Sequence, residues 1–439
     1  MYINWKCLWG LLVGLWALPG LIVAQEMLDL NQALGIALEN NYAIKIAKTQ
    51  QQLAQSNFNR GNAGFYPRLT ANLTQNFGRT DVRQEFATGS VQQRIGAASN
   101  TLIGNLNLNW TLFDGLAMFA AYERLGEQKK ITDLNLLQNV ETTARNVTVA
   151  YFDIIQQQQR LRSFQNNLLI SAKRLELAKD RYEIGSGSKI EYLNAQVDYN
   201  ADRSDIIRQE LSIKNSKIRL NRILLRASDT DFSISDSILV NPDLSYNALL
   251  EAARSNNLAI RLAKQNRKVS EIQYREVRAD RLPTISLNVD YTFTRAASEA
   301  GILLRSNNLG LVLGLNASFN IFNGRNQHRL EQNAKINILL NEQQQADLMA
   351  ELERSVTELF NSYQNSLLLA ELEKENLNIA LQNVEVALER YKLGVTTFLE
   401  LREVQRNVIA AENRLIDAIY QAKLAEIELL RLTNNLVRI

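Results

Sequence analysis

The first half of this sequence recurs in the second half. Residues 28–48 align with residues 244–264 at an offset of 216 (244 − 28), and the same offset relates Pro67 to Pro283. An internal repeat indicates two copies of one structural unit that pack against each other. Any fold proposed for this chain must therefore account for each of its elements twice.

Both halves contain the same glycine turn. Gly185 and Gly394 are equivalent at an offset of 209 (394 − 185), so one loop of the first half is longer than its counterpart. Each glycine ends a long helical pattern, and a new pattern begins behind Ser188 or Thr397. Glycine accepts the positive φ of a helix C-terminus, and Ser or Thr caps the next helix. Each turn therefore predicts a helical hairpin.

Very long helices flank each turn. Residues 116–184 and 325–393 keep a helical period throughout, which corresponds to about 100 Å at 1.5 Å per residue. Apolar residues recur every seven positions there and in the return helices, 188–226 and 397–435. This spacing predicts coiled coils that turn back on themselves. The Gln156–Gln159 run lies off these seams, and we interpret it as solvated surface.

The sequence pattern changes after Pro67 and Pro283. Apolar residues there alternate with Asn, Thr and Ser at a period of two, first in one direction and then back. We predict β-hairpins over about residues 68–113 and 284–322, with four strands of about ten residues. Polar outer loops are expected at about 80–104 and 296–308.

The amino-terminal residues differ from the rest. Lys6 precedes an apolar run from Leu8 to Val23, and Ala24 is followed by polar residues. This order predicts a secretory signal peptide over residues 1–24, with an uncleaved anchor as the alternative. No later stretch approaches the roughly 20 apolar residues that a membrane helix requires.

Strands with one apolar and one polar face, in an exported chain, are typical of an outer-membrane barrel. A half-buried hairpin of a water-soluble protein is the alternative. Four strands cannot close a barrel, and open strand edges cannot stand in lipid. If these strands cross a membrane, several copies of the chain must complete the barrel together.

The repeat divides the chain into parts. We predict a first repeat over residues 25–227, a linker over 228–243 that forms a short strand or turn, and a second repeat over 244–439. Each repeat begins with a short amphipathic helix, at about 30–38 and 246–254. The predicted fold class is thus mostly α, with long coiled-coil helices and four β-strands per chain.

The composition offers little to support catalysis. Lys and Arg number 49 against 46 Asp and Glu, and no strongly basic stretch suggests nucleic acid. His328 and Cys7 are the only residues of their types, so we expect no multi-ligand metal site and no thiol chemistry. Phosphate-binding, metalloprotease and serine-hydrolase motifs are absent from the sequence. We expect neither a cofactor nor enzymatic activity.

Three acidic residues follow the glycine turns: Glu191, Glu400 and Glu403. Glu400 and Glu403 are three residues apart and share a helix face. Several copies of that face around one axis would form acidic rings that favour cations. The alternative is that they are ordinary first-turn acids, which the helix dipole favours.

The order and double occurrence of these features resemble the TolC-type outer-membrane efflux channels, over about residues 28–436. The resemblance implies a homotrimer, with a shared 12-stranded barrel in outer-membrane lipid and a hollow α-barrel of helices in the periplasm. The short helices and residues 228–243 would form a belt around the α-barrel. The glycine turns would be the periplasmic tip.

The resemblance also implies roles for individual residues. Gly185 and Gly394 would contact a periplasmic adaptor protein. Glu400 and Glu403 match the paired acids that ring the pore constriction in the best-known member, where both are Asp.

Closure of the tip is implied to involve two further residues. Glu191 matches an acid that helps to hold the tip shut, and Tyr391 matches a tyrosine that it contacts. The family also uses an arginine here, but this chain has Thr396 at that position. The familiar arginine link is therefore absent.

The implied function is a passive conduit in a tripartite efflux or type I secretion system. An inner-membrane RND or ABC transporter would drive it through the adaptor, and that pump would select the cargo. The rival hypothesis is a structural or adhesive coiled-coil protein of the envelope that forms no pore.

Overall fold

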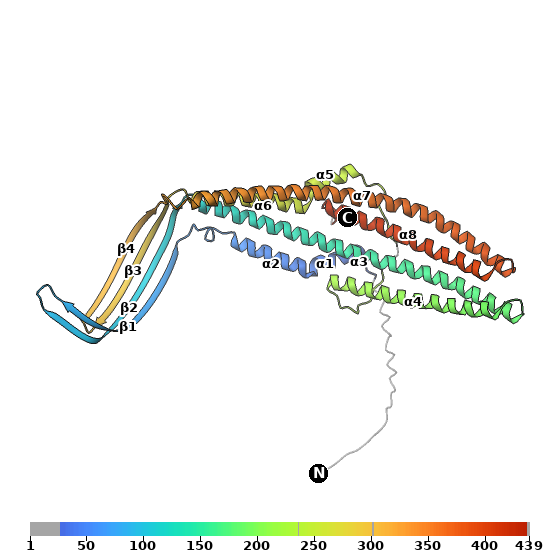
Figure 1. Ribbon diagram of the computed structural model, residues 1–439, viewed down its shortest axis with the longest axis horizontal. Coiled ribbons are helices and arrows are strands. Elements are labelled where there is room, and N and C mark those ends of the chain that lie inside the picture. The colour runs from blue at the N-terminus through green and yellow to red at the C-terminus, as the bar shows by residue number, and fades with distance from the viewer. Residues whose placement is uncertain (1–26, 236, 301–302, 437–439) are drawn as a thin grey trace, which may run out of the picture.

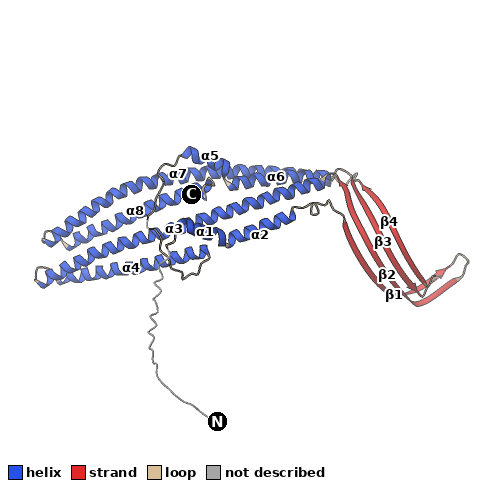
Figure 2. Ribbon diagram, turned by 180° about the vertical axis from the view of Figure 1, so that it is seen from behind, coloured by secondary structure: helices blue, strands red, loops and turns tan. Residues whose placement is uncertain are grey.

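The computed structural model describes residues 27–235, 237–300 and 303–436, so the predicted signal peptide lies outside the described residues. A β-sheet lies at one end of an elongated bundle of helices, and the two glycine turns lie at the other end (Figure 1). The view from behind shows the same separation of strands from helices (Figure 2). No described helix is both long and apolar enough to cross a membrane.

The sheet contains four antiparallel strands in the order β1-β2-β3-β4. Its strands are β1 (Arg68–Glu85), β2 (Val91–Asp114), β3 (Thr284–Ser298) and β4 (Arg305–Ser318). Strand β2 belongs to the first repeat and β3 to the second, so their pairing joins the two halves of the chain. Strands β1 and β4 each have one edge that pairs with no other described strand.

The outer loops are shorter than the sequence analysis predicted. Most of residues 80–104 is strand, because β1 and β2 continue their backbone pairing to a turn at residues 86–90. Strands β3 and β4 likewise extend into residues 296–308. The predicted strand length of about ten residues was therefore wrong: the strands have 18, 24, 15 and 14 residues. Backbone hydrogen bonds continue where apolar alternation has ended.

The register gives the sheet one apolar and one polar face, as the alternation predicts. Rows of apolar side chains run across all four strands on one face. On the other face Asn107 donates to Asp290 over 2.7 Å, and Asn105 donates to Thr292 over 3.0 Å. Two of the apolar rows are Leu69, Leu108, Val289 and Leu313, and Ala71, Leu106, Tyr291 and Leu311.

The long helices form two antiparallel pairs. Helix α3 (Ala117–Glu183) packs with α4 (Lys189–Leu224), and α7 (Asn326–Lys392) packs with α8 (Phe398–Leu432). Helices α3 and α7 each contain 67 residues, or about 100 Å of helix. This length separates the sheet from the glycine turns (Figure 1).

Shorter helices line the long pairs between the sheet and the middle of the molecule (Figure 1). They are α1 (Leu30–Asn40) and α2 (Tyr42–Asn57) in the first repeat, and α5 (Tyr246–Asn256) and α6 (Leu258–Ala279) in the second. Described residues of the 228–243 linker are mostly irregular. Phe232 and Ile234 of this linker are nevertheless buried in an apolar cluster with α1, α3, α4 and α8.

One asparagine in each repeat joins a short helix to a return helix. Asn41 caps α2 by accepting from the amide of Ala43 (2.8 Å) and donates to the carbonyl of Ile223 at the end of α4 (3.1 Å). Asn257 caps α6 in the same way and donates to the carbonyl of Leu432 at the end of α8 (3.0 Å). Asn41 and Asn257 are thus tertiary clamps as well as caps.

We expect Asn257→Ala to lower the free energy of unfolding by about 2 kcal/mol, because it removes both a helix cap and a buried hydrogen bond. Urea unfolding of the detergent-purified protein would measure this loss. The neighbouring Asn256 is exposed and provides the control. Asn256→Ala should have a much smaller effect, and an equal loss in the two variants would contradict the clamp.

Candidate functional site

The two glycine turns have the same geometry. Gly185 has a φ of 71° and Gly394 a φ of 77°, both in the left-handed region. The residue after each glycine donates its amide to the carbonyl four residues before that glycine, as in Ser186 to Arg181 and Val395 to Arg390, both over 2.9 Å. A side chain at either glycine would strain the backbone. Both glycines are exposed at the far end of the helices.

The acidic residues after the turns serve partly as helix caps. Thr397 accepts from the amide of Glu400 over 3.2 Å, and the Glu400 carboxylate accepts from the amide of Thr397 over 3.2 Å. This capping box accounts for an acid at position 400 without any pore. Glu403 is exposed, as is Glu400, and both lie off the buried seam of α8. Their exposure is compatible with a lumenal ring, which stays a prediction.

Tyr391 lies at the centre of the tip. Its side chain is fully buried in an apolar cluster that draws on α3, α4, α7 and α8. The tyrosine therefore holds the two hairpins of one chain together close to their turns. The other buried members of this cluster are Ala178, Ala195, Ala387, Phe398 and Leu401.

Two charged residues act on Tyr391 differently. The Arg181 guanidinium lies 5.0 Å from the centre of the tyrosine ring, as a cation–π contact. Burial raises the pKa of Tyr391, and the negative charge of Glu191 raises it further. The buried Tyr391 hydroxyl has no hydrogen-bond partner among the described residues. Glu191 thus influences Tyr391 through its charge, and no hydrogen bond joins them in this conformation.

A buried polar cluster lies about 16 Å from the first turn, since Arg174 is 11 residues before Gly185. The Arg174 side chain is 2% exposed and donates to Asp198 of α4 over 2.8 Å. Arg402 of α8 reaches the same carboxylate oxygen at 3.4 Å. One carboxylate therefore joins α3, α4 and α8. We call this set the Arg174 cluster; it comprises Ser171, Arg174, Asp198, Asp202, Arg402 and Gln405.

Burial sets the electrostatics of the Arg174 cluster. Desolvation lowers the pKa of Arg174, and the charge of Asp198 acts in the opposite direction. Desolvation also raises the pKa of Asp202, which accepts a hydrogen bond from Ser171. Removing one member would leave another buried charge with weaker compensation. The cluster is therefore sensitive to any separation of its helices.

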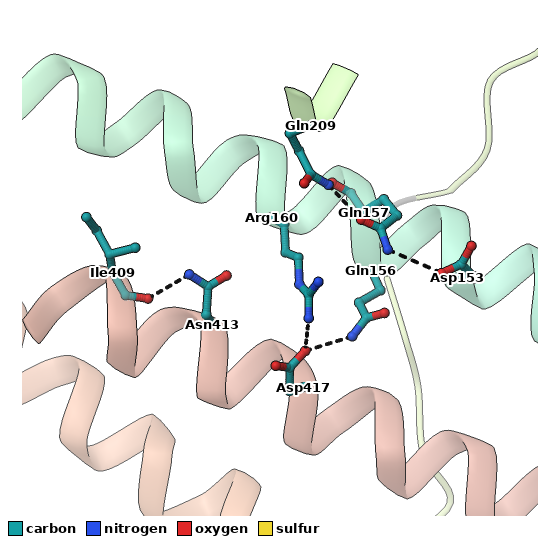
Figure 3. A network of polar contacts seen from close by, with 8 residues as sticks. All are labelled: Asp153, Gln156, Gln157, Arg160, Gln209, Ile409, Asn413 and Asp417. Carbon is teal, nitrogen blue, oxygen red and sulfur yellow. Dashed lines mark hydrogen bonds and ion pairs between the residues drawn. The ribbon is translucent and has the colours of Figure 1, made fainter. Parts of the chain in front are cut away.

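Polar contacts continue along the interface between α3 and α8. Gln156 donates to Asp417 over 2.8 Å, and Arg160 pairs with the same carboxylate (Figure 3). The interpretation of Gln156–Gln159 as solvated surface was wrong for Gln156, whose side chain is buried. Its amide lies between two coiled coils. The periodicity of one helix taken alone does not reveal this position.

The sequence does contain a signal for this interface. Arg160, Asn167 and Arg174 are spaced by seven residues, as are Gln405 and Glu412. Asn167 accepts from Gln405 over 2.6 Å. These residues form a second, polar seam beside the apolar one, and a search restricted to apolar heptads misses it.

Comparison with known proteins identifies the family. The profile of the family described as outer membrane efflux protein matches residues 33–224 and 249–435. Outer membrane protein TolC of Escherichia coli is 20% identical over 94% of this chain and 84% of its own length. The cation efflux system protein CusC of E. coli is 22% identical over 90% of this chain and 83% of its own length.

Solved structures show the same fold. The Campylobacter jejuni CmeC outer membrane channel superposes with a TM-score of 0.78 at 14% identity, over 92% of this chain and 85% of that one. The outer membrane protein VceC of Vibrio cholerae gives 0.76 at 16% identity, over 92% and 96%. With its repeat, its four strands and its paired long helices, this chain belongs to the outer membrane efflux protein family.

Proposed function

We propose that this protein is the outer-membrane channel of a tripartite efflux or type I secretion system, and that three copies form one passive conduit. The observation that carries the proposal is the sheet, which has an apolar face and two edges unpaired in one chain. Three copies of four strands would give a closed barrel of 12 strands (3 × 4).

Exposed apolar seams on the helices support association of copies. On α7 and at its C-cap, Leu372, Ile379, Val386 and Leu393 are spaced by seven residues and are all exposed in one chain. Helix α4 has an equivalent exposed set, spaced by seven or fourteen residues. Such seams are typical of coiled-coil contacts that lack their partner. The α4 set comprises Ile190, Val197, Leu211 and Ile218.

Partners follow from this arrangement. The sheet would stand in outer-membrane lipid, and the long helices would carry the turns at Gly185 and Gly394 deep into the periplasm. There the turns would contact an adaptor protein, which links the channel to an inner-membrane RND or ABC transporter. The conduit itself would perform no chemical reaction, and its polar strand and helix faces would line a water-filled path.

Opening would separate polar contacts between the hairpins. Polar pairs join α3 to α8 and also join α3 to α4, whereas an apolar cluster near the turns draws on all four long helices. Polar partners can exchange for water as helices move, so we propose that the α7–α8 hairpin shifts against the α3–α4 hairpin. The Arg174 cluster would close this interface in place of the missing arginine at Thr396.

Asp198→Asn should favour the open state, because it leaves the Arg174 charge buried with only Asp202 nearby. A loss of about 2 kcal/mol in closed-state stability would raise the open population more than tenfold. Single-channel recordings in planar bilayers would measure the open fraction. Lys173→Gln changes an exposed charge one residue away and should have little effect.

A double variant distinguishes the loss of the contact between Arg174 and Asp198 from general damage to the fold. Arg174→Met combined with Asp198→Leu replaces the buried pair by apolar side chains and should restore part of the closure, because Asp202 and Arg402 still lose their partners. If Asp198→Asn left the open fraction unchanged while the trimer stayed intact, the proposed role of the Arg174 cluster in closure would be wrong.

Glu400→Gln combined with Glu403→Gln should weaken the preference for cations, because a lumenal ring of three chains would lose six carboxylates (3 × 2). Reversal potentials in a salt gradient would measure this preference. Glu39→Gln with Glu210→Gln removes the same charge from exposed positions away from the tip. An unchanged reversal potential in the first variant would show that these acids do not face the pore.

A further inference from the structure

Arginines mark the outer end of the apolar face of the sheet. The constant register places Phe77, Asn100, Ala297 and Arg305 in one row across the four strands, on the same face as the apolar rows. Arg295 lies on this face one row nearer the apolar rows, and Arg79 lies one row farther out. All three arginines are exposed.

The spacing along β2 places these arginines at a membrane boundary. Trp110 faces the same side as the apolar rows and donates its indole N–H to the carbonyl of Phe65 over 3.0 Å. Asn100, in the Arg305 row, is ten residues from Trp110, or about 33 Å of strand. With a tilt of about 40° this span covers about 25 Å of membrane thickness, the height of the apolar band of such barrels. If Trp110 lies at one interface, the arginines lie at the other.

The carboxylates of this region do not neutralise the arginines. Asp81 accepts from the amide of Gly96 over 2.6 Å, and Glu299 accepts from the amide of Ala98 over 3.1 Å. No described acid forms an ion pair with Arg79, Arg295 or Arg305. Three guanidinium groups are thus left without an anionic partner at the border of an apolar surface.

A cavity of about 760 Å³ lies at this border. Its walls combine three arginines and one carboxylate residue, Glu299, with apolar side chains. A net positive wall beside apolar side chains is the lining that an anionic headgroup with acyl chains would require. The lining residues used in this argument are Phe77, Arg79, Arg94, Leu304 and Arg305.

We propose that Arg79, Arg295 and Arg305 bind the phosphate groups of a phosphorylated glycolipid in the outer leaflet of the outer membrane. Guanidinium groups bind phosphate through two parallel hydrogen bonds, and the neighbouring apolar rows would receive the acyl chains. In a trimer the three residues would form a positive girdle around the barrel. This inference rests on the proposed function, because it requires the apolar face to contact lipid.

The test compares two lipids on the detergent-purified full-length protein. Lipid A with two phosphates is titrated into the protein, and native mass spectrometry measures its binding. The titration is repeated with the same lipid after enzymatic removal of its phosphates. The phosphorylated form should bind more tightly, and the triple variant Arg79→Gln, Arg295→Gln, Arg305→Gln should lose this preference. The expected loss is roughly a hundredfold, since each arginine near an anionic surface contributes roughly fivefold.

Control measurements decide between the outcomes. Arg68→Gln lies on the polar face near the opposite end of β1 and should bind lipid A as the unaltered protein does. Equal binding of both lipids, or retained preference in the triple variant, would overturn the proposal. Displacement of lipid A by millimolar inorganic phosphate would also overturn the proposal, because the arginines would then form a site for soluble anions. Pores without lipid preference would refute this inference alone, whereas protein that forms neither trimers nor pores would refute the proposed function.

Discussion

The structure depends on the backbone hydrogen bonds at the two edges of its sheet. Strands β1 and β4 each present N–H and C=O groups that no described strand of the same chain satisfies. In water these groups can be solvated, but in hydrocarbon each unsatisfied group costs several kcal/mol. A second copy of the chain can satisfy them, so the apolar face and the open edges together require assembly.

The helical part is held together by apolar and polar contacts. Apolar heptads resist separation because their surfaces avoid water. Polar pairs join one hairpin to the other, as in Arg160 with Asp417, and also join α3 to α4, as in Gln209 with Gln157 (Figure 3). Hydrogen-bonded groups lose less when water replaces a partner, which is why we propose movement at the polar contacts between hairpins. The exposed seams on α4 and α7 remain for contacts between copies.

Much of the fold was predictable because it rests on local periodicity. The seven-residue spacing predicted the long helices, and the alternation after Pro67 and Pro283 predicted both hairpins. The pairing of β2 with β3 was not predicted, since it joins residues about 190 positions apart through a register with no local signal. The Arg174 cluster was missed for another reason: buried arginine is rare, and its partners lie on α4 and α8. Strand length was underestimated because polar residues keep pairing after the apolar pattern ends.

Cysteine cross-linking tests the central claim, which is that β1 of one copy pairs with β4 of the next. Cys7 is the only cysteine in the sequence and lies in the predicted signal peptide. Disulfide bonds would therefore form between the introduced cysteines without competition from a native one. Thr70→Cys would be combined with a single cysteine scanned from Leu309 to Leu315, and membranes would be oxidised before denaturing electrophoresis. The account predicts that some pairs give covalent dimers and trimers and no larger species. Monomers at every scanned position, or a ladder that continues beyond trimers, would contradict it.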